Sequence, residues 1–128
     1  MSKTTTVYLS GPMSGLPDNN FHTFNAAAYS LRMVGYSVVN PAELQTDVTG
    51  LDEQTAWREF MKVDIKMLVD CDAIVMLPAW PESRGACLER SIAQGLSMRV
   101  MTLTDAILEA PEHVEAAYRA VQEMAVAA

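Results

Sequence analysis

The sequence predicts one α/β domain built on an open, all-parallel sheet with helices on both faces. Short β-rich runs alternate with helix-length segments along the chain. One of these runs, DAIVML (72–77), is continuously apolar, as expected for a strand covered by helices on both faces. The 128 residues, half of them apolar, are enough to bury about two thirds of the unfolded surface, so residues 1–128 are expected to form a single domain.

The first half of the chain predicts a strand, a helix and a second strand. The strands are expected at TTVYLS (5–10) and GYSVVN (35–40). Between them, FHTFNAAAYSLRMVG (21–35) carries apolar residues at helical spacing, and Gly35 marks the end of the helix. This stripe consists of Phe21, Phe24, Ala28, Leu31 and Val34. The polar stretch from residue 45 to residue 54 is a loop of a length that is often functional.

The second half repeats the alternation. Helices are expected at 55–70, 85–96 and 111–125, and strands at 72–77 and 99–104. The first of these helices should face inward with Trp57, Phe60, Met61, Ile65 and Leu68. Because parallel strands require right-handed crossovers, this order predicts a flavodoxin- or Rossmann-like sheet of about four or five strands.

Ligands of such sheets bind outside the carboxyl ends of the strands. The segments that follow the expected strands are SGPMSG (10–15), NPAE (40–43), PAWPESRG (78–85) and the region of Thr104 and Asp105. The candidate substrate-binding residues of the first segment are Ser10, Gly11, Pro12 and Met13.

The third segment leads into a helix and suits an anion. Ser83, Arg84 and Gly85 precede or begin that helix, whose free N–H groups and positive dipole end favour a phosphate. Alternatively, Ser83 is only an N-cap and Arg84 is a solvated side chain. Trp80, between two prolines, either stacks on a ligand base or covers the edge of the sheet.

Two carboxylates are candidates for catalysis. Glu89 lies early in the helix after the third strand, where the dipole is expected to favour its ionised form, and Asp64 lies in the preceding helix. Such a pair would serve glycosyl transfer, one as nucleophile and one as general acid. The alternative is that Glu89 is a surface residue, which is the commonest position of a glutamate. Tyr8 could orient a carboxylate or simply pack. Asp72 is expected to be a cap or turn residue.

Composition excludes several function classes. A net charge of −7 argues against binding a nucleic acid polymer, which requires clustered Lys and Arg. The sequence has no apolar leader and no window long enough for a membrane span, so a cytoplasmic protein without membrane contact is expected. Two cysteines, Cys71 and Cys87, are too few for a disulfide scaffold. They have no neighbouring His or Cys at metal-ligand spacing, so neither a metal nor a cofactor is expected.

Four segments together resemble the nucleoside 2-deoxyribosyltransferase superfamily, in particular its short phage-associated members. These segments are YLSGPMSG, GYSVVNPAE, DIKMLVDCDAIVML and SRGACLE, and the resemblance covers residues 7 to about 104. It implies that Glu89 attacks C1′ of a nucleoside, that Asp64 assists protonation of the leaving base and that Tyr8 orients the nucleophile. It also implies that Ser83 binds the phosphate, as in relatives that hydrolyse 2′-deoxynucleoside 5′-monophosphates, and that the protein forms a homo-oligomer.

The sequence departs from the family at the turn before the nucleophile. SRGACLE lacks the D-G-T-like turn of the transferases, and Arg84 has no counterpart in the hydrolases. The expected function is therefore cleavage or transfer of the N-glycosidic bond of a nucleoside or, preferably, its 5′-monophosphate. The alternatives are a nucleotide-binding module without turnover and, more weakly, a purely structural oligomer.

Overall fold

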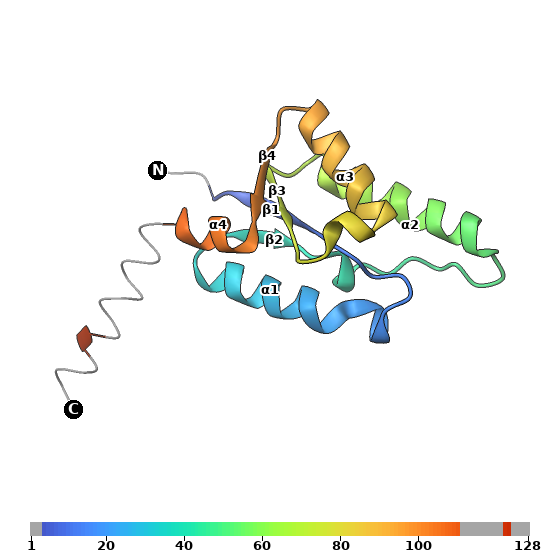
Figure 1. Ribbon diagram of the computed structural model, residues 1–128, viewed down its shortest axis with the longest axis horizontal. Helices are drawn as coiled ribbons and strands as arrows, with labels where there is room; N and C mark the ends of the chain where they lie inside the picture. Colours follow the sequence, from blue (N-terminus) through green and yellow to red (C-terminus); the bar gives the residue numbers. More distant parts are fainter. Residues whose placement is uncertain (1–3, 111–121, 124–128) are drawn as a thin grey trace.

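The chain folds around one open sheet of four parallel strands in the order β2-β1-β3-β4, seen in the computed structural model of Figure 1, which describes residues 4–110 and 122–123. The strands are β1 (Thr6–Ser10), β2 (Ser37–Val39), β3 (Ala73–Met76) and β4 (Arg99–Thr102). In the register, Tyr8 of β1 pairs with Val39 on one side and with Ile74 on the other. The expected all-parallel sheet is confirmed, with the strand order of flavodoxin-like proteins.

Helices cover both faces of the sheet, as the alternation of elements predicted. The α-helices are α1 (Phe21–Met33), α2 (Glu53–Leu68), α3 (Arg84–Gly95) and α4 (Leu103–Leu108). Short 3-10 turns lie at η1 (Pro17–Asn20), η2 (Pro41–Glu43) and η3 (Trp80–Glu82). In Figure 1, α1 and α4 lie on one side of the sheet and α2 and α3 on the other.

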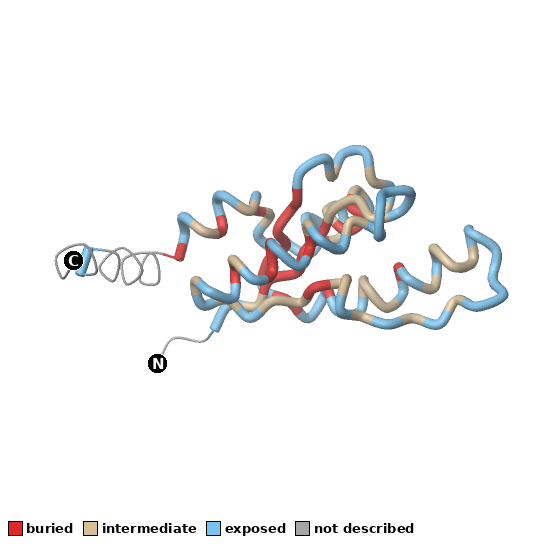
Figure 2. The backbone as a smooth tube through the Cα atoms, turned by 90° about the horizontal axis from the view of Figure 1, so that it is seen from below, coloured by how far each residue is buried: buried red, intermediate tan, exposed pale blue. Residues whose placement is uncertain are grey.

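The alternation of side chains along β1 divides the core into two clusters. Val7 and Leu9 join the cluster that packs against α1 and α4, whereas Tyr8 joins the cluster under α2 and α3. Since side chains two residues apart in a strand share a face, Ser10 points to the same side as Tyr8. Figure 2 shows the buried residues concentrated in the strands and on the inner faces of the helices.

The observed elements after β3 differ in their bounds from those expected from the sequence. The strand expected at 99–104 ends at Thr102. The short helix α4, which was not predicted, begins directly after it. The Oγ1 atom of Thr102 accepts a hydrogen bond from the backbone N–H of Asp105 at 3.1 Å and so caps α4. The helix expected at 111–125 lies outside the described residues except for 122–123.

Fewer residues of α2 face inward than its apolar stripe predicted. Met61 and Leu68 of α2 are buried, but Phe60, expected to face inward, is 42% exposed. Cys71 is buried. Asp72 lies in the bend before β3, which agrees with the expected turn position, and its Oδ2 accepts a hydrogen bond from the backbone N–H of Thr6 at 2.8 Å. Among the described residues, no helix has the length and apolar character needed to cross a membrane.

Candidate active site

A cavity of about 410 Å³ opens at the carboxyl ends of β1 and β3, a volume within the usual range of small-molecule sites. These neighbouring strands continue into helices on opposite faces, α1 after β1 and α3 after β3, which makes this end of the sheet a topological switch point. The walls come from the segment after β1, the starts of α1 and α3, the segment after β2 and one face of α2. The site therefore lies where the sequence predicted a crevice.

Glu89 is a buried residue on the wall of this cavity. It is the sixth residue of α3, its exposed fraction is only 5%, and it lines the cavity. Its two carboxyl oxygens accept hydrogen bonds from two hydroxyl groups of β1. Tyr8 donates to Oε2, and Ser10 donates to Oε1 at 2.7 Å. A surface position for Glu89, the alternative left open by the sequence, is thereby excluded.

Burial of Glu89 raises its pKa from 4.5 to about 7. The hydrogen bonds from Tyr8 and Ser10 lower this pKa, while the negative charge of Asp64 raises it further. The expectation that the helix dipole would favour the ionised form was wrong. The dipole acts mainly within the first turn, and Glu89 lies beyond that turn, so desolvation determines the direction of the shift.

Asp64 lines the same cavity from the opposite wall, on α2. It is half-buried, and this burial raises its pKa from 3.8 to about 6. Its charge acts on both Glu89 and Tyr8, raising the pKa of each. Within the described residues no hydrogen bond is made to the Asp64 carboxyl group, which leaves it available to a ligand.

Tyr8 remains a neutral hydrogen-bond donor at physiological pH. Its burial, together with the charge of Glu89, raises its pKa well above the ordinary value of 10.0. A tyrosine and a serine two residues apart on one strand thus hold both oxygens of one carboxylate. The orienting role of Tyr8 was predicted from the sequence, whereas Ser10 was predicted to bind substrate. The 1% exposed Ser10 lies against Glu89 instead of on the cavity wall.

The start of α3 forms the rim of the cavity. Ser83 is the N-cap of α3, where its Oγ accepts the backbone N–H of Ala86 at 3.1 Å, and it also lines the cavity. The hydroxyl hydrogen of Ser83 is therefore still free to be donated to a ligand. Gly85 lets α3 approach α2 closely, because a Cβ there would lie 3.2 Å from the Sδ atom of Met61.

Arg84 lies next to Ser83 on the cavity wall and is held from two sides. Its guanidinium carbon lies 3.8 Å from the centroid of the Trp57 ring, and Nη1 donates to Oε1 of Gln54 at 3.0 Å. In the described part of the chain Arg84 forms no salt bridge, so its charge is available to an anion in the cavity.

The other predicted binding residues separate into two groups. Gly11, Pro12 and Met13 line the cavity. Trp80 does not line the cavity and packs against the core cluster under α2 and α3. The guanidinium carbon of Arg90 lies over the Trp80 ring, 4.7 Å from its centroid. The interpretation of Trp80 as a cover for the sheet fits this position better than stacking on a ligand.

Several cavity residues were not singled out as site residues in the sequence. Trp57, Phe60 and Met61 project from α2 on the same wall as Asp64, and Phe21 and Phe24 line the cavity from α1. The signal that could have identified them is the helical spacing of Trp57, Phe60 and Met61 from Asp64, which places all four on adjacent positions of one helix face. In residues 4–110 and 122–123, no cluster of three His, Cys, Asp or Glu side chains is suited to hold a metal ion.

Comparison with known proteins identifies a family but not an activity. A search among proteins of established function found no match. A family model described as "Domain of unknown function (DUF4406)" matches residues 5–102, which include all four strands, Glu89 and Asp64. Because this match covers well over half of the 128 residues, the chain belongs to the DUF4406 family.

Proposed function

We propose that the protein cleaves or transfers the N-glycosidic bond of a nucleoside or, preferably, a nucleoside 5′-monophosphate. The observation that carries this proposal is the buried carboxylate of Glu89, held by two hydroxyl donors and facing a cavity that it shares with Asp64. A fixed carboxylate beside a second carboxyl group of raised pKa is the arrangement that retaining glycosyl transfer requires.

In the proposed first step, a carboxylate oxygen of Glu89 attacks C1′ and forms an ester with the sugar. The bond between C1′ and the base nitrogen breaks, its electron pair passes to that nitrogen, and Asp64 delivers a proton to the departing base. In the second step water attacks C1′, and its proton passes to Asp64 while the ester bond breaks and Glu89 regains its charge. Replacing the water with a second base gives transfer instead of hydrolysis.

This mechanism requires one proton on the pair, located on Asp64. The raised pKa values of about 7 for Glu89 and about 6 for Asp64 mean that the pair holds its last proton close to neutral pH. The hydroxyls of Tyr8 and Ser10 both donate to Glu89, and a carboxylate accepts two such bonds better than a protonated acid. These contacts lower the pKa of Glu89 but leave it above that of Asp64, so the mechanism requires the bound substrate to shift the proton to Asp64.

The preference for a monophosphate rests on the rim of the cavity. Ser83 offers a hydroxyl hydrogen, and Arg84 offers a guanidinium that Trp57 and Gln54 hold in place without neutralising it. A phosphate bound there would also face the positive end of α3. In a chain of net charge −7, such a local positive group distinguishes an anion site from the rest of the surface.

A nucleotide-binding module without turnover is the second candidate, because the same rim would hold a nucleotide whether or not it reacts. The deciding experiment incubates the protein with a panel of nucleosides and 5′-monophosphates and measures the released base by chromatography, with and without a second free base. Base release that is lost in Glu89→Gln by several orders of magnitude supports the enzyme. A nucleotide complex that raises the melting temperature yet persists unchanged for hours identifies the binding module.

A further inference from the structure

Helix α2 is anchored to the rest of the domain in different ways at its two ends. At the carboxyl end, Leu68 is fully buried, and it is the only α2 residue that belongs to a core cluster of the described residues. The amino-terminal half, together with the loop before it, projects beyond the sheet and the other helices in Figures 1 and 2. The main neighbour of α2 among the described elements is α3. The position of the projecting half therefore depends on its contacts with α3.

These contacts gather at the start of α3. The guanidinium carbon of Arg84 lies 3.8 Å from the centroid of the Trp57 ring, and Nη1 donates to Oε1 of Gln54 at 3.0 Å. About one turn further along α2, Met61 approaches Gly85 so closely that a Cβ there would lie 3.2 Å from its Sδ atom. In the described part of the chain, the bond from Arg84 to Gln54 is the only side-chain hydrogen bond between α2 and another helix or strand. Arg84 is thus both the group offered to an anion and a tie to the projecting half of α2.

Asp64 lies on the same face of α2 as Trp57. Seven residues, about two helical turns, separate them, and both side chains line the cavity. Because two turns of one helix move together, the placement of Trp57 against α3 sets how Asp64 lies relative to Glu89, which α3 carries. No hydrogen bond within the described residues holds the Asp64 carboxyl group itself. The position of α2 is therefore what places Asp64 in the cavity.

Glu89, in contrast, is fixed independently of α2. Its two carboxyl oxygens accept hydrogen bonds from two hydroxyl groups of β1. One member of the carboxyl pair is therefore held by the sheet, whereas the other depends on the contacts at the start of α3. A guanidinium stacked by its face still presents its edge donors to a phosphate. A phosphate that binds Arg84 therefore acts on the group that contacts Trp57, and through α2 on Asp64 alone.

We propose that Trp57 is a positioning residue through which a phosphate bound by Arg84 holds α2 against α3 and so fixes Asp64 beside Glu89. The 5′-phosphate of the substrate then raises the rate of base cleavage as well as the affinity. The physical reason is that binding energy from a part of the substrate that does not react is used to order a catalytic group for the transition state. The inference rests on the proposed glycosidic function and gives the phosphate a role in its rate.

Supplying the substrate in two pieces tests this link. Base release from a free nucleoside is measured with and without inorganic phosphate, with chloride at the same ionic strength as the salt control, and kcat and KM are compared with those of the intact 5′-monophosphate. Inorganic phosphate should raise kcat for the free nucleoside about tenfold, the size of a typical coupling between two sites. Arg84→Gln should lose this activation, and because Arg84 is exposed its replacement leaves the core untouched.

Two substitutions of Trp57 separate positioning from direct contact with the substrate. Trp57→Leu removes the ring face against Arg84, so it should lower kcat for the monophosphate about tenfold more than kcat for the free nucleoside. Trp57→Phe keeps a ring face and should retain most of the activation by phosphate. Equal losses of kcat for the two substrates in Trp57→Leu would show that Trp57 acts on the base or on folding, and would overturn the proposal.

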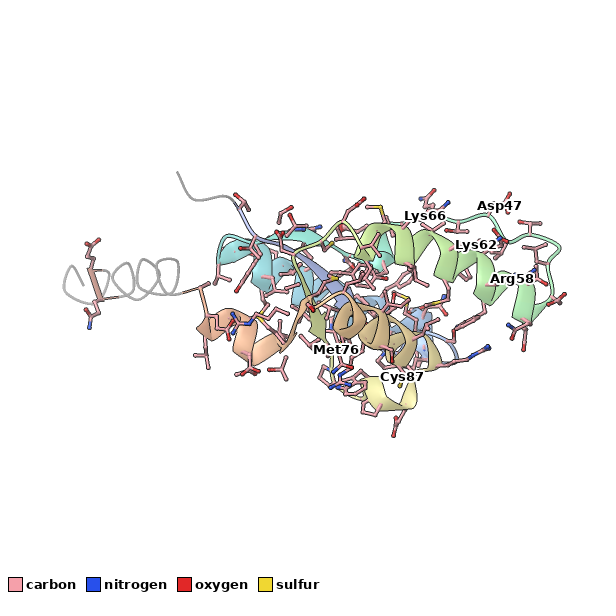
Figure 3. All side chains as sticks on the ribbon, turned by 90° about the horizontal axis from the view of Figure 1, so that it is seen from above. Asp47, Arg58, Lys62, Lys66, Met76 and Cys87 are labelled. Carbon is pink, nitrogen blue, oxygen red and sulfur yellow. The ribbon has the colours of Figure 1, made fainter. Side chains whose placement is uncertain are left out.

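Two control variants should keep the wild-type activation. Arg90→Gln is the matched control, because Arg90 also lies over a tryptophan, Trp80, but neither of them lines the cavity. Lys66→Gln removes a positive charge from α2 itself. Lys66, labelled in Figure 3, follows Trp57 by nine residues, about two and a half helical turns, and so lies on the opposite side of the helix. Loss of activation in either control would show that the effect is not specific to Arg84 and would overturn the proposal.

The role of Trp57 and the proposed function fail in different ways. An active wild type with the same kcat for the free nucleoside and the monophosphate, unchanged by inorganic phosphate, would overturn the role of Trp57 and leave the glycosidic function standing. Absence of base release from every substrate would remove the function and, with it, the effect on rate. The contact between Arg84 and Trp57 also has a readout that needs no turnover. In Trp80→Phe, Trp57 is the only tryptophan of the chain, and inorganic phosphate should shift its fluorescence unless Arg84→Gln is also present. Fluorescence that does not respond to phosphate would overturn the proposal.

Discussion

Glu89→Gln should stabilise the folded protein at the same pH at which it abolishes turnover. The pKa of Glu89 rises from 4.5 in the unfolded chain to about 7 in the fold, because the carboxyl group is buried. The folded state therefore binds this proton more tightly than the unfolded state, and the wild type loses stability as pH rises from about 4.5 to about 7. Below about pH 4.5 Glu89 is protonated in both the folded and the unfolded state, and above about pH 7 the loss of stability is complete.

The size of the effect follows from the difference between the two pKa values. At about 1.4 kcal/mol per unit, the ionised carboxylate costs about 3 kcal/mol of folding free energy above neutral pH. Gln has nearly the same shape, can accept from one hydroxyl and donate to the other, and carries no charge to bury. At alkaline pH the variant should therefore melt about 10 °C above the wild type, a difference that shrinks toward acid pH.

Thermal unfolding followed by circular dichroism across this pH range measures the difference directly. Glu82→Gln, which removes the charge of an exposed glutamate in η3, is the control and should follow the wild-type curve at every pH. Parallel curves for the wild type and Glu89→Gln would show that Glu89 has the same proton affinity folded and unfolded. That result would refute the argument from burial.

Three further substitutions test other parts of the site. Tyr8→Phe removes a donor that lowers the pKa of Glu89, so the acid limb of the pH–rate profile should move to higher pH by about one unit; an unmoved limb would contradict the orienting role. Ser83→Ala should raise KM for a monophosphate while changing KM for the free nucleoside little, and equal changes in both KM values would argue against a phosphate contact. Because the substitution also removes the N-cap of α3, it should lower the free energy of unfolding by about 1 kcal/mol. Gly11→Ala would place a Cβ 2.9 Å from Cβ of Leu77, so chemical denaturation should report a loss of about 1–3 kcal/mol, and a wild-type midpoint would show that the two strands separate easily.

The fold was largely predictable from the sequence because its signals are local. The continuous apolar run of β3 and the helical stripe of α1 each specify one element, and right-handed crossovers then restrict the topology. The short helix α4 was missed because its six residues directly follow β4, and the apolar Leu103 reads as one more strand residue. Only Thr102, followed three residues later by Asp105, carries the capping signal.

Part of the membership of the site was predictable from the sequence, but its electrostatics were not. Residues that follow strands can be assigned to one end of a parallel sheet from topology alone, which is why Glu89, Ser83 and Met13 were expected near each other and do line one cavity. The pKa of Glu89 depends instead on how deeply α3 is buried against β1, a tertiary property. The stacking of Arg84 on Trp57 likewise joins two helices whose relative position the sequence does not specify.

The electrostatics of Glu89 make it difficult to explain as a structural residue. A core position selected only for stability would favour an apolar side chain or a neutral amide, because the buried charge costs free energy above neutral pH. Yet β1 supplies two hydroxyls, one to each carboxyl oxygen, and both stabilise the charged form that burial opposes. The same carboxylate faces a cavity whose far wall carries Asp64, half-buried and free of hydrogen bonds in the described residues. An ionised group held at a cost to stability, oriented on both oxygens and open to a ligand on one side, is the pattern expected of a nucleophile.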